Sequence, residues 1–156
     1  MAARRYWLFK TEPGSYSITD LQRDGKTFWD GIRNYQARNF LRDDIKAGDG
    51  VLFYHSLADP PAIVGSATVL TDGYPDHTQF EQGHRKFDPK ATTDNPRWYM
   101  VDIQFEEAFP RILALEELRG VPALANMELL RKGSRLSVQP VSKSEWDAVL
   151  RLSKKI

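Results

Sequence analysis

The chain contains no cysteine and no long apolar run. Without cysteine there can be no disulfide framework, no thiolate nucleophile and no Cys-ligated zinc site. No stretch approaches the ~20 consecutive apolar residues of a membrane helix, and the N-terminal apolar run is shorter than the ~7–15 residues of a signal-peptide core. These absences predict a cytoplasmic protein in a reducing compartment, with no membrane partner.

The sequence also lacks a strong excess of charge of either sign. Its 22 Lys and Arg residues are almost balanced by 21 Asp and Glu residues, which gives a formal net charge of +1. Attraction of the whole molecule to nucleic acid would therefore be weak, and any such binding must use a local patch. At 156 residues with 41% hydrophobic content, the chain is expected to form one globular domain over residues 1–156.

Short apolar runs bounded by turn residues predict an α+β chain. Strands are expected at 6–10, 51–55, 62–70, 98–109 and 135–141. Helices are expected from the cap at Ser17 to Gly25, from Asn34 to Asp43, at 113–119, at 127–132 and after the capping box at Ser142. Because the helices are few and short, alternating parallel units are excluded. We predict a mixed, mostly antiparallel sheet that curls toward a barrel and is flanked by short helices.

The segment 71–97 is the longest weakly patterned stretch, and it holds two of the three histidines. A loop of this length is usually functional or mobile. Its histidines, His77 and His84, have no cysteine or HExxH pattern near them, so surface histidines are favoured over a metal site. Just before it, Gly65 lies inside a predicted strand, where glycine indicates a β-bulge or a sharp bend.

The segment 29–42 is the most unusual part of the chain. It carries three aromatic residues, three side-chain amides and three arginines, with little aliphatic content. Rings can stack on a planar ligand, amides can read its edges, and guanidinium groups can hold a phosphate. The competing interpretation is a helix with core aromatics and solvated arginines. Asn34 fits as a helix N-cap alone or as a cap whose neighbourhood faces a ligand.

A binding pocket is favoured over an active site. His55 and Ser56 are adjacent, yet the sequence has neither a nucleophile elbow nor a glycine-rich phosphate loop, so no catalytic residue and no cofactor is predicted. Tyr54, His55 and Ser56 end a predicted strand, a position from which sheets often supply pocket residues. Trp29 and Trp98 are large rings that could line the same pocket, although each of these residues also has an ordinary explanation as core, strand or turn.

A family pattern runs through five segments of the chain, at 6–13, 29–39, 53–56, 60–65 and 135–141. These segments resemble the EVE domain, and the run WDGIRNYQARN at 29–39 is long and specific. The resemblance covers residues 6–152. It implies a PUA-like fold, related to the YTH domain that reads methylated adenine in RNA. It also implies recognition of modified bases in DNA, such as 5-methylcytosine or 5-hydroxymethylcytosine.

The resemblance further implies a set of ligand-binding residues. Trp29 and Trp98 are expected to stack on the base, with Phe87 as the alternative to Trp98. Edge-reading groups are expected at Thr11, Asn34 and Ser56, and rim or wall residues at Tyr54 and His55. The expected contacts to phosphate are Lys10, Arg33, Arg38, Arg42, Arg85 and Lys86. For these cations the competing explanation is ordinary solvated surface.

Three functions are compatible with the same pocket. The first is a non-catalytic reader of a modified base in DNA, in which the base leaves the helix and inserts between rings. The second is a reader of a modified base in RNA, and the third is a protein or enzyme that takes a free modified nucleoside. We favour DNA. A pocket closed over by 71–97 would indicate the small molecule, whereas an open pocket with Arg38 and Arg42 at its mouth would indicate a polymer.

Overall fold

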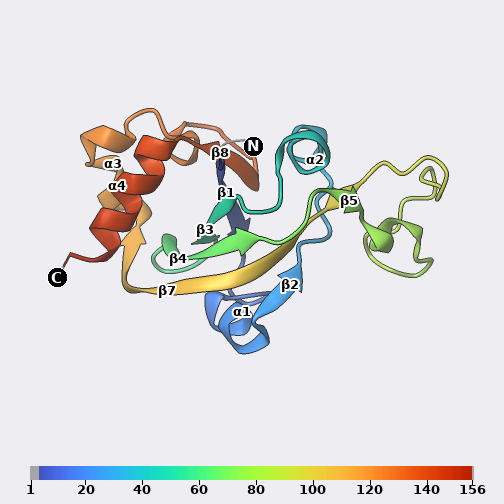
Figure 1. Cartoon of the computed structure of the whole chain (residues 1–156), viewed down its shortest axis with the longest axis horizontal. Coiled ribbons are helices and arrows are strands. Elements are labelled where there is room, and N and C mark those ends of the chain that lie inside the picture. The colour runs from blue at the N-terminus through green and yellow to red at the C-terminus, as the bar shows by residue number, and fades with distance from the viewer. Residues whose placement is uncertain (1–3, 156) are drawn as a thin grey trace.

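A computed structural model describes residues 4–155 of the chain. Its main sheet has six strands in the order β2-β7-β4-β3-β1-β8. The strands are β1 (Tyr6–Thr11), β2 (Lys26–Phe28), β3 (Gly50–His55), β4 (Ala62–Val69), β7 (Asp102–Ala114) and β8 (Val138–Val141). Only β1 and β3 run parallel, and the other neighbouring pairs are antiparallel. Because β7 curves across the whole molecule, the sheet forms a half-barrel, which confirms the predicted fold class (Figure 1).

Four short α-helices flank the sheet, namely α1 (Ile18–Asp24), α2 (Tyr35–Asn39), α3 (Leu115–Arg119) and α4 (Lys143–Ser153). A π-helix, η1 (Phe40–Asp44), continues α2, and 3-10 turns lie at η2 (His77–Phe80), η3 (Pro122–Leu124) and η4 (Glu128–Leu130). A separate ribbon pairs β5 (Tyr74–Pro75) with β6 (Tyr99–Met100). Helices α3 and α4 lie together at one end of β7, and the ribbon lies at the other end (Figure 1).

The predicted capping residues start three of these helices. Ser17 and Ser142 each form a capping box with the acid three residues further on. The Asn34 side-chain oxygen accepts the N–H of Ala37 at 3.0 Å and so caps α2. The bulge predicted at Gly65 is also present, since the register of β4 against β7 shifts there.

The prediction of one strand over 98–109 was wrong in its boundaries. The strand is interrupted at Val101, between β6 and β7, where the Val101 carbonyl accepts the N–H of Trp29 at 2.8 Å. Strand β7 then continues to Ala114, because Ala114 pairs with Ala62 at the start of β4. The helices predicted at 113–119 and 127–132 are correspondingly shortened to α3 and to the single turn η4.

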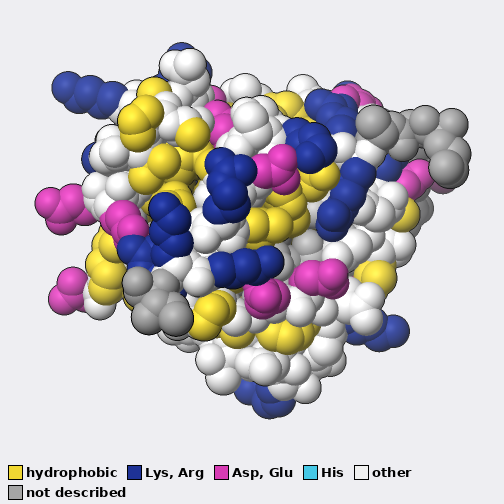
Figure 2. Space-filling model, turned by 60° about the vertical axis from the view of Figure 1, so that its left-hand side comes forward, with side chains coloured by type: hydrophobic (Ala, Val, Ile, Leu, Met, Phe, Trp, Pro, Cys, Tyr) yellow, Lys and Arg dark blue, Asp and Glu magenta, His cyan; other side chains and the backbone are white. Residues whose placement is uncertain are grey.

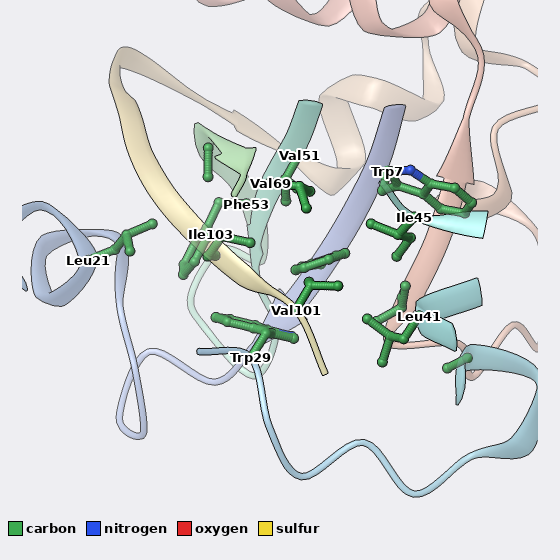
Figure 3. Close-up of a cluster of buried hydrophobic side chains, with 14 of the residues drawn as sticks. Trp7, Leu21, Trp29, Leu41, Ile45, Val51, Phe53, Val69, Val101 and Ile103 are labelled. Atoms are coloured by element: carbon green, nitrogen blue, oxygen red, sulfur yellow. The ribbon is translucent and has the colours of Figure 1, made fainter. Parts of the chain in front are cut away.

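Both faces of the sheet are buried, which explains the continuous apolar run in β1. Trp7 and Phe9 point into one hydrophobic cluster together with Trp29 and Phe53, whereas Leu8 between them belongs to a second cluster. Figure 3 shows Trp29 packed into the first cluster with side chains of the sheet. Trp29 is therefore part of the core, and the segment 29–42 is attached to the sheet at its first residue.

Surface charge is mixed on the side of the molecule that carries α3 and α4. On this face Lys and Arg side chains lie among Asp and Glu side chains and among exposed hydrophobic ones (Figure 2). This distribution agrees with the net charge of only +1. Within residues 4–155, no helix is long and apolar enough to cross a bilayer.

Gly73 brings the segment 71–97 into very close contact with η1. A Cβ built on Gly73 would lie 1.9 Å from the carbonyl oxygen of Leu41, a backbone atom that cannot rotate away. We therefore expect Gly73→Ala to lower the free energy of unfolding by roughly 1–3 kcal/mol, as measured by urea denaturation. Gly14→Ala is the matched control, because a Cβ at Gly14 meets nothing within 4 Å. Equal losses in the two variants would contradict this close approach.

Candidate functional site

A pocket of about 330 Å³ opens where β1 ends, beside β2 and the start of the segment 29–42. Its volume is at the lower end of the ~300–1,000 Å³ typical of small-ligand sites. The lining combines rings, hydroxyl groups, one carboxylate and two cations: Lys10, Thr11, Ser15, Tyr16, Thr27, Phe28, Trp29, Asp30, Ile32 and Arg85. This combination suits a small planar molecule that carries polar groups on its edge.

Trp29 is the most rigidly held ring of the lining. Only 8% of its surface is exposed, and its ring lies 5.5 Å from Phe9, 5.6 Å from Phe53 and 6.3 Å from Tyr16, between ring centroids. By contrast, Phe28 is 47% exposed and reaches the rim. Contacts on several sides fix the Trp29 ring before any ligand arrives, so binding would not have to order it.

The polar groups of the pocket differ in how far the protein already uses them. The Thr11 hydroxyl donates to the Tyr16 carbonyl at 2.9 Å, and the Tyr16 hydroxyl donates to Asp24 at 2.8 Å. Burial and the hydrogen bond to Asp24 raise the pKa of Tyr16 to about 12, so its proton stays in place at neutral pH. Within the part of the chain that the structure describes, the Asp30 carboxylate accepts no hydrogen bond, so it is available to a donor on a ligand.

The wall that contains Asp30 depends on a carboxylate from the segment 71–97. Asp76 is fully buried and accepts the N–H of Gly31 at 2.7 Å, the Arg33 guanidinium at 3.1 Å and the N–H of Thr78 at 2.8 Å. Burial alone would raise the pKa of Asp76. The hydrogen bonds from Thr78, Gly31 and Arg33 outweigh burial and hold the pKa below its usual range. The carboxylate therefore stays charged and fixes Gly31 next to Asp30.

Arg33 extends the same network to the other side of the pocket. Its guanidinium also donates to the carbonyl of Lys86 at 2.8 Å and to the Thr78 hydroxyl at 3.1 Å. Lys86 follows Arg85, whose side chain lines the pocket. The segment 71–97 is thus held in place by Arg33 of the segment 29–42. Arg33 pairs with Asp76 near the start of the segment 71–97 and donates to the carbonyl of Lys86 further along it.

The structure places two predicted base-binding residues, Thr11 and Trp29, at the pocket, together with two predicted phosphate contacts, Lys10 and Arg85. Trp98 lies elsewhere and does not form a cage with Trp29. Its ring stacks on Tyr35 at 4.8 Å between centroids, and its Nε1 donates to Asp88 at 2.7 Å. That hydrogen bond is the main cause of a lowered pKa of Asp88. Trp98 thus joins the segment 71–97 to α2, and Phe87, the alternative ring, does not line the pocket either.

None of the three predicted residues at the end of β3 lines the pocket. Tyr54 is 4% exposed and belongs to the second hydrophobic cluster. The Nε2 atom of His55 accepts the N–H of Ile18 at 3.1 Å, at the start of α1. The N–H of Ser56 donates to the carbonyl of Thr11 at 2.9 Å. Two of these three residues thereby fix segments whose neighbours line the pocket.

Three of the six predicted phosphate contacts are already engaged within the protein. Arg33 pairs with Asp76, Arg38 donates to the carbonyl of Arg97 at 2.7 Å, and Arg42 pairs with Asp43. Neither Arg38 nor Arg42 lies at the pocket mouth, so the arrangement that would have indicated a polymer is absent among its lining residues. Lys10 and Arg85 line the pocket instead. Burial lowers the pKa of Lys10, partly offset by the nearby Glu128.

Sequence reasoning missed six lining residues: Ser15, Tyr16, Thr27, Phe28, Asp30 and Ile32. Two of them come from β2, which is only three residues long and gave no strand pattern. Asp30 and Ile32 lie inside the segment 29–42. The prediction was based on the rings, amides and arginines of that segment and did not consider its one carboxylate. Among residues 4–155, no three His, Asp or Glu side chains are grouped so that they could hold a metal ion.

Comparisons with known proteins place the chain in a family. The family model described as EVE domain matches residues 5–152. Human thymocyte nuclear protein 1 is 44% identical over 170 residues, which cover 96% of this chain and 74% of that protein. A hypothetical protein from Leishmania major superposes with a TM-score of 0.91 at 43% identity, over 97% of this chain and 96% of that one. Human THYN1 protein in complex with 5-methylcytosine-containing DNA superposes with a TM-score of 0.90 at 41% identity, over 97% and 99%.

The buried carboxylate of Asp76 gives a prediction for stability and its pH dependence. Because its pKa is lowered in the folded state, its contribution is present above the unfolded pKa of ~3.9 and is lost as pH falls through the folded value. Asp76→Asn should lower the free energy of unfolding at pH 7 by about 3 kcal/mol, and the loss should shrink toward pH 3. Asp94→Asn, an exposed acid on the same segment, is the control in urea denaturation. If Asp76→Asn lost the same free energy of unfolding at pH 7 and at pH 3, the conclusion that the Asp76 carboxylate is charged in the folded protein would be contradicted.

His55 gives a second pH prediction, in a different range. Burial lowers the pKa of His55, so the neutral ring that accepts the N–H of Ile18 is the folded form. Protonation is then more favourable in the unfolded chain, and stability should fall as pH drops below ~6.5 toward 5. His55→Gln keeps an acceptor that does not titrate and should show a flatter profile over this range in thermal unfolding. If the midpoint of thermal unfolding changed with pH equally in the wild type and in His55→Gln, the hydrogen bond from Ile18 to His55 would be contradicted.

Proposed function

Because this chain belongs to the EVE domain family, as its sequence pattern predicted, we propose that it binds DNA containing 5-methylcytosine and leaves the base unchanged. One observation carries the proposal: a protein 41% identical over 97% of this chain has been crystallised with DNA of that kind. The same observation favours DNA over RNA and over a free nucleoside. The pocket beside Trp29 is where we place the base.

The geometry supports a base that has left its stack. The pocket has a volume of about 330 Å³ and is lined on several sides, so a base inside a duplex would have to rotate outward to enter it. Phe28 and Tyr16 offer ring surface at its walls, and Trp29 closes its inner end. Stacking of a base on such rings contributes about 1–3 kcal/mol and is tolerant of base identity. Selectivity must therefore come from the edge groups.

Asp30 is the group best suited to read the edge of a cytosine. Cytosine presents an exocyclic amino group at C4, which donates hydrogen bonds, and a carboxylate is its natural partner. Thymine carries the same methyl group at C5 but has a carbonyl oxygen at C4, which a carboxylate repels. A free acceptor at Asp30 therefore distinguishes 5-methylcytosine from thymine, and apolar contact with Phe28 or Ile32 favours the methylated over the plain base.

The two cations of the pocket provide a small number of contacts to the phosphates of the DNA strand. Lys10 and Arg85 line the pocket from two sides, where the phosphates that flank an extruded nucleotide would pass. With only two such cations and a net charge of +1, affinity should be weak and should fall with added salt.

Several features of the pocket support binding without catalysis. The Thr11 hydroxyl donates a hydrogen bond to a backbone carbonyl, and the Tyr16 hydroxyl donates one to Asp24. A carbonyl does not take a proton, and because the pKa of Tyr16 is raised to about 12 while that of Asp24 is lowered, Tyr16 keeps its proton and is not a nucleophile. The lining among the described residues contains no histidine. A reader that holds the base by stacking and edge contacts needs none of these groups.

The test is a fluorescence titration with oligonucleotides that carry 5-methylcytosine, cytosine or thymine at one unpaired position. The wild type should prefer 5-methylcytosine over cytosine by roughly 10-fold, because one methyl group in an apolar site gives a ratio of that order. It should also reject thymine. Asp30→Asn, whose amide can donate to the thymine carbonyl, should keep the preference for methylated over plain cytosine but lose the rejection of thymine.

Asp59→Asn is the matched control, since Asp59 lines a different recess, with Pro60 and Arg119. It should leave all three affinities unchanged. Rejection of thymine that survives in Asp30→Asn would remove Asp30 from the reading of the base. Equal wild-type binding of all three oligonucleotides would contradict the proposed function itself.

A further inference from the structure

Leu57 is the most exposed large hydrophobic residue of the described chain. It is 83% exposed, whereas other exposed hydrophobic residues, such as Tyr35 and Phe28, are 51% and 47% exposed. It is also the one residue other than glycine, among residues 4–155, with a positive φ, at 48°. Its side chain therefore gains little from packing in the free protein.

This combination is unfavourable for folding. The left-handed backbone region costs a residue with a Cβ roughly 1–2 kcal/mol, and glycine or asparagine would adopt it more readily. Exposure of an isolated leucine is common and needs no explanation by itself. Exposure together with a strained backbone is different, because neither packing nor local conformation favours leucine here. Such an outlier is a reason to look for a function.

The position of Leu57 points to what that function is. Leu57 follows Ser56, whose N–H donates to the carbonyl of Thr11 at 2.9 Å, and Thr11 lines the pocket. Leu57 thus lies just beyond the end of β3, one residue from the backbone hydrogen bond that joins this loop to Thr11 of the pocket. The loop is also anchored at its far end, where the carbonyl of Pro61 accepts the N–H of Leu115 at 2.9 Å.

The segments next to Leu57 carry charges of both signs. The only acid of this loop, Asp59, lines a separate recess with Pro61 and Arg119, and Leu57 is not part of that recess. On the side of β1, Lys10 lines the pocket, and Glu12 follows Thr11 as an exposed acid. Insertion of an exposed apolar side chain between bases is a way in which proteins kink and unstack a duplex.

We propose that Leu57 inserts into double-stranded DNA and fills the space that the extruded base leaves behind. This inference rests on the proposed function, and it adds that the preferred partner is a duplex rather than a single strand. Removal of a base from a duplex unstacks its neighbours, which is costly unless an apolar group replaces the lost contacts. In a single strand there is no such gap, so Leu57 has nothing to fill.

The test compares binding of Leu57→Gly to a duplex with one central 5-methylcytosine and to the same methylated strand alone. Duplex affinity should fall roughly 10-fold, the ratio expected from the lost burial of one leucine side chain. Affinity for the single strand and the preference for methylated over plain cytosine should stay within about twofold of wild type. The thermal midpoint should be unchanged or higher, because glycine relieves the backbone strain at this position.

Two further variants sharpen the comparison. Leu57→Met keeps an apolar side chain and should retain duplex affinity. Leu70→Ala removes an exposed leucine at the opposite end of β4 and should leave binding to both DNAs unchanged. In parallel, 2-aminopurine placed next to the methylated base should brighten with the wild type, as its stacking is lost, and brighten less with Leu57→Gly.

The outcomes are separable. If Leu57→Gly weakens binding to the duplex and the single strand equally, or weakens neither, the insertion of Leu57 is refuted, whatever the protein reads. If the wild type shows no preference for methylated cytosine in either DNA, the proposed function fails first. Loss of duplex binding in both Leu57→Gly and Leu70→Ala would also overturn the inference, because the effect would not be specific to Leu57.

Discussion

The buried carboxylate of Asp76 holds together the two segments that form the outer walls of the pocket. It accepts hydrogen bonds from Gly31 and from Arg33, and Arg33 in turn donates to the carbonyl of Lys86. One wall of the pocket contains Asp30, next to Gly31, and the other contains Arg85, next to Lys86. A charge buried without partners would be very costly, so this group constrains all of its neighbours at once. The pocket shape depends on that constraint.

Two carboxylates in the same region therefore have opposite roles, which follow from their surroundings. Asp76 has its oxygens saturated by protein donors and serves the structure. Asp30 is next to Gly31 but accepts no hydrogen bond within residues 4–155, so its oxygens are free for a ligand. The rings divide in a similar way: Trp29 is fixed by the core, Trp98 joins the segment 71–97 to α2, and Phe28 stays exposed at the rim.

The sequence was sufficient to predict five of the six strands of the main sheet, the caps and the family, because these depend on local patterns and on a long specific run. It was not sufficient to assign the arginines. Arg33 meets Asp76 across 43 residues of sequence, and no local pattern reveals whether a guanidinium faces solvent or a buried acid. The sequence also does not reveal the positive φ of Leu57, because that backbone conformation is a property of the folded chain. A cytoplasmic location stays a prediction.

The most direct measurement is a crystal structure of this protein with a short duplex that carries one 5-methylcytosine. The account predicts that the methylated base lies outside the helix in the pocket beside Trp29, with its amino nitrogen about 2.8–3.0 Å from a carboxylate oxygen of Asp30. It also predicts that the side chain of Leu57 occupies the position the base has left. A methylated base that remains stacked in the duplex, or that occupies a different recess, would contradict the account.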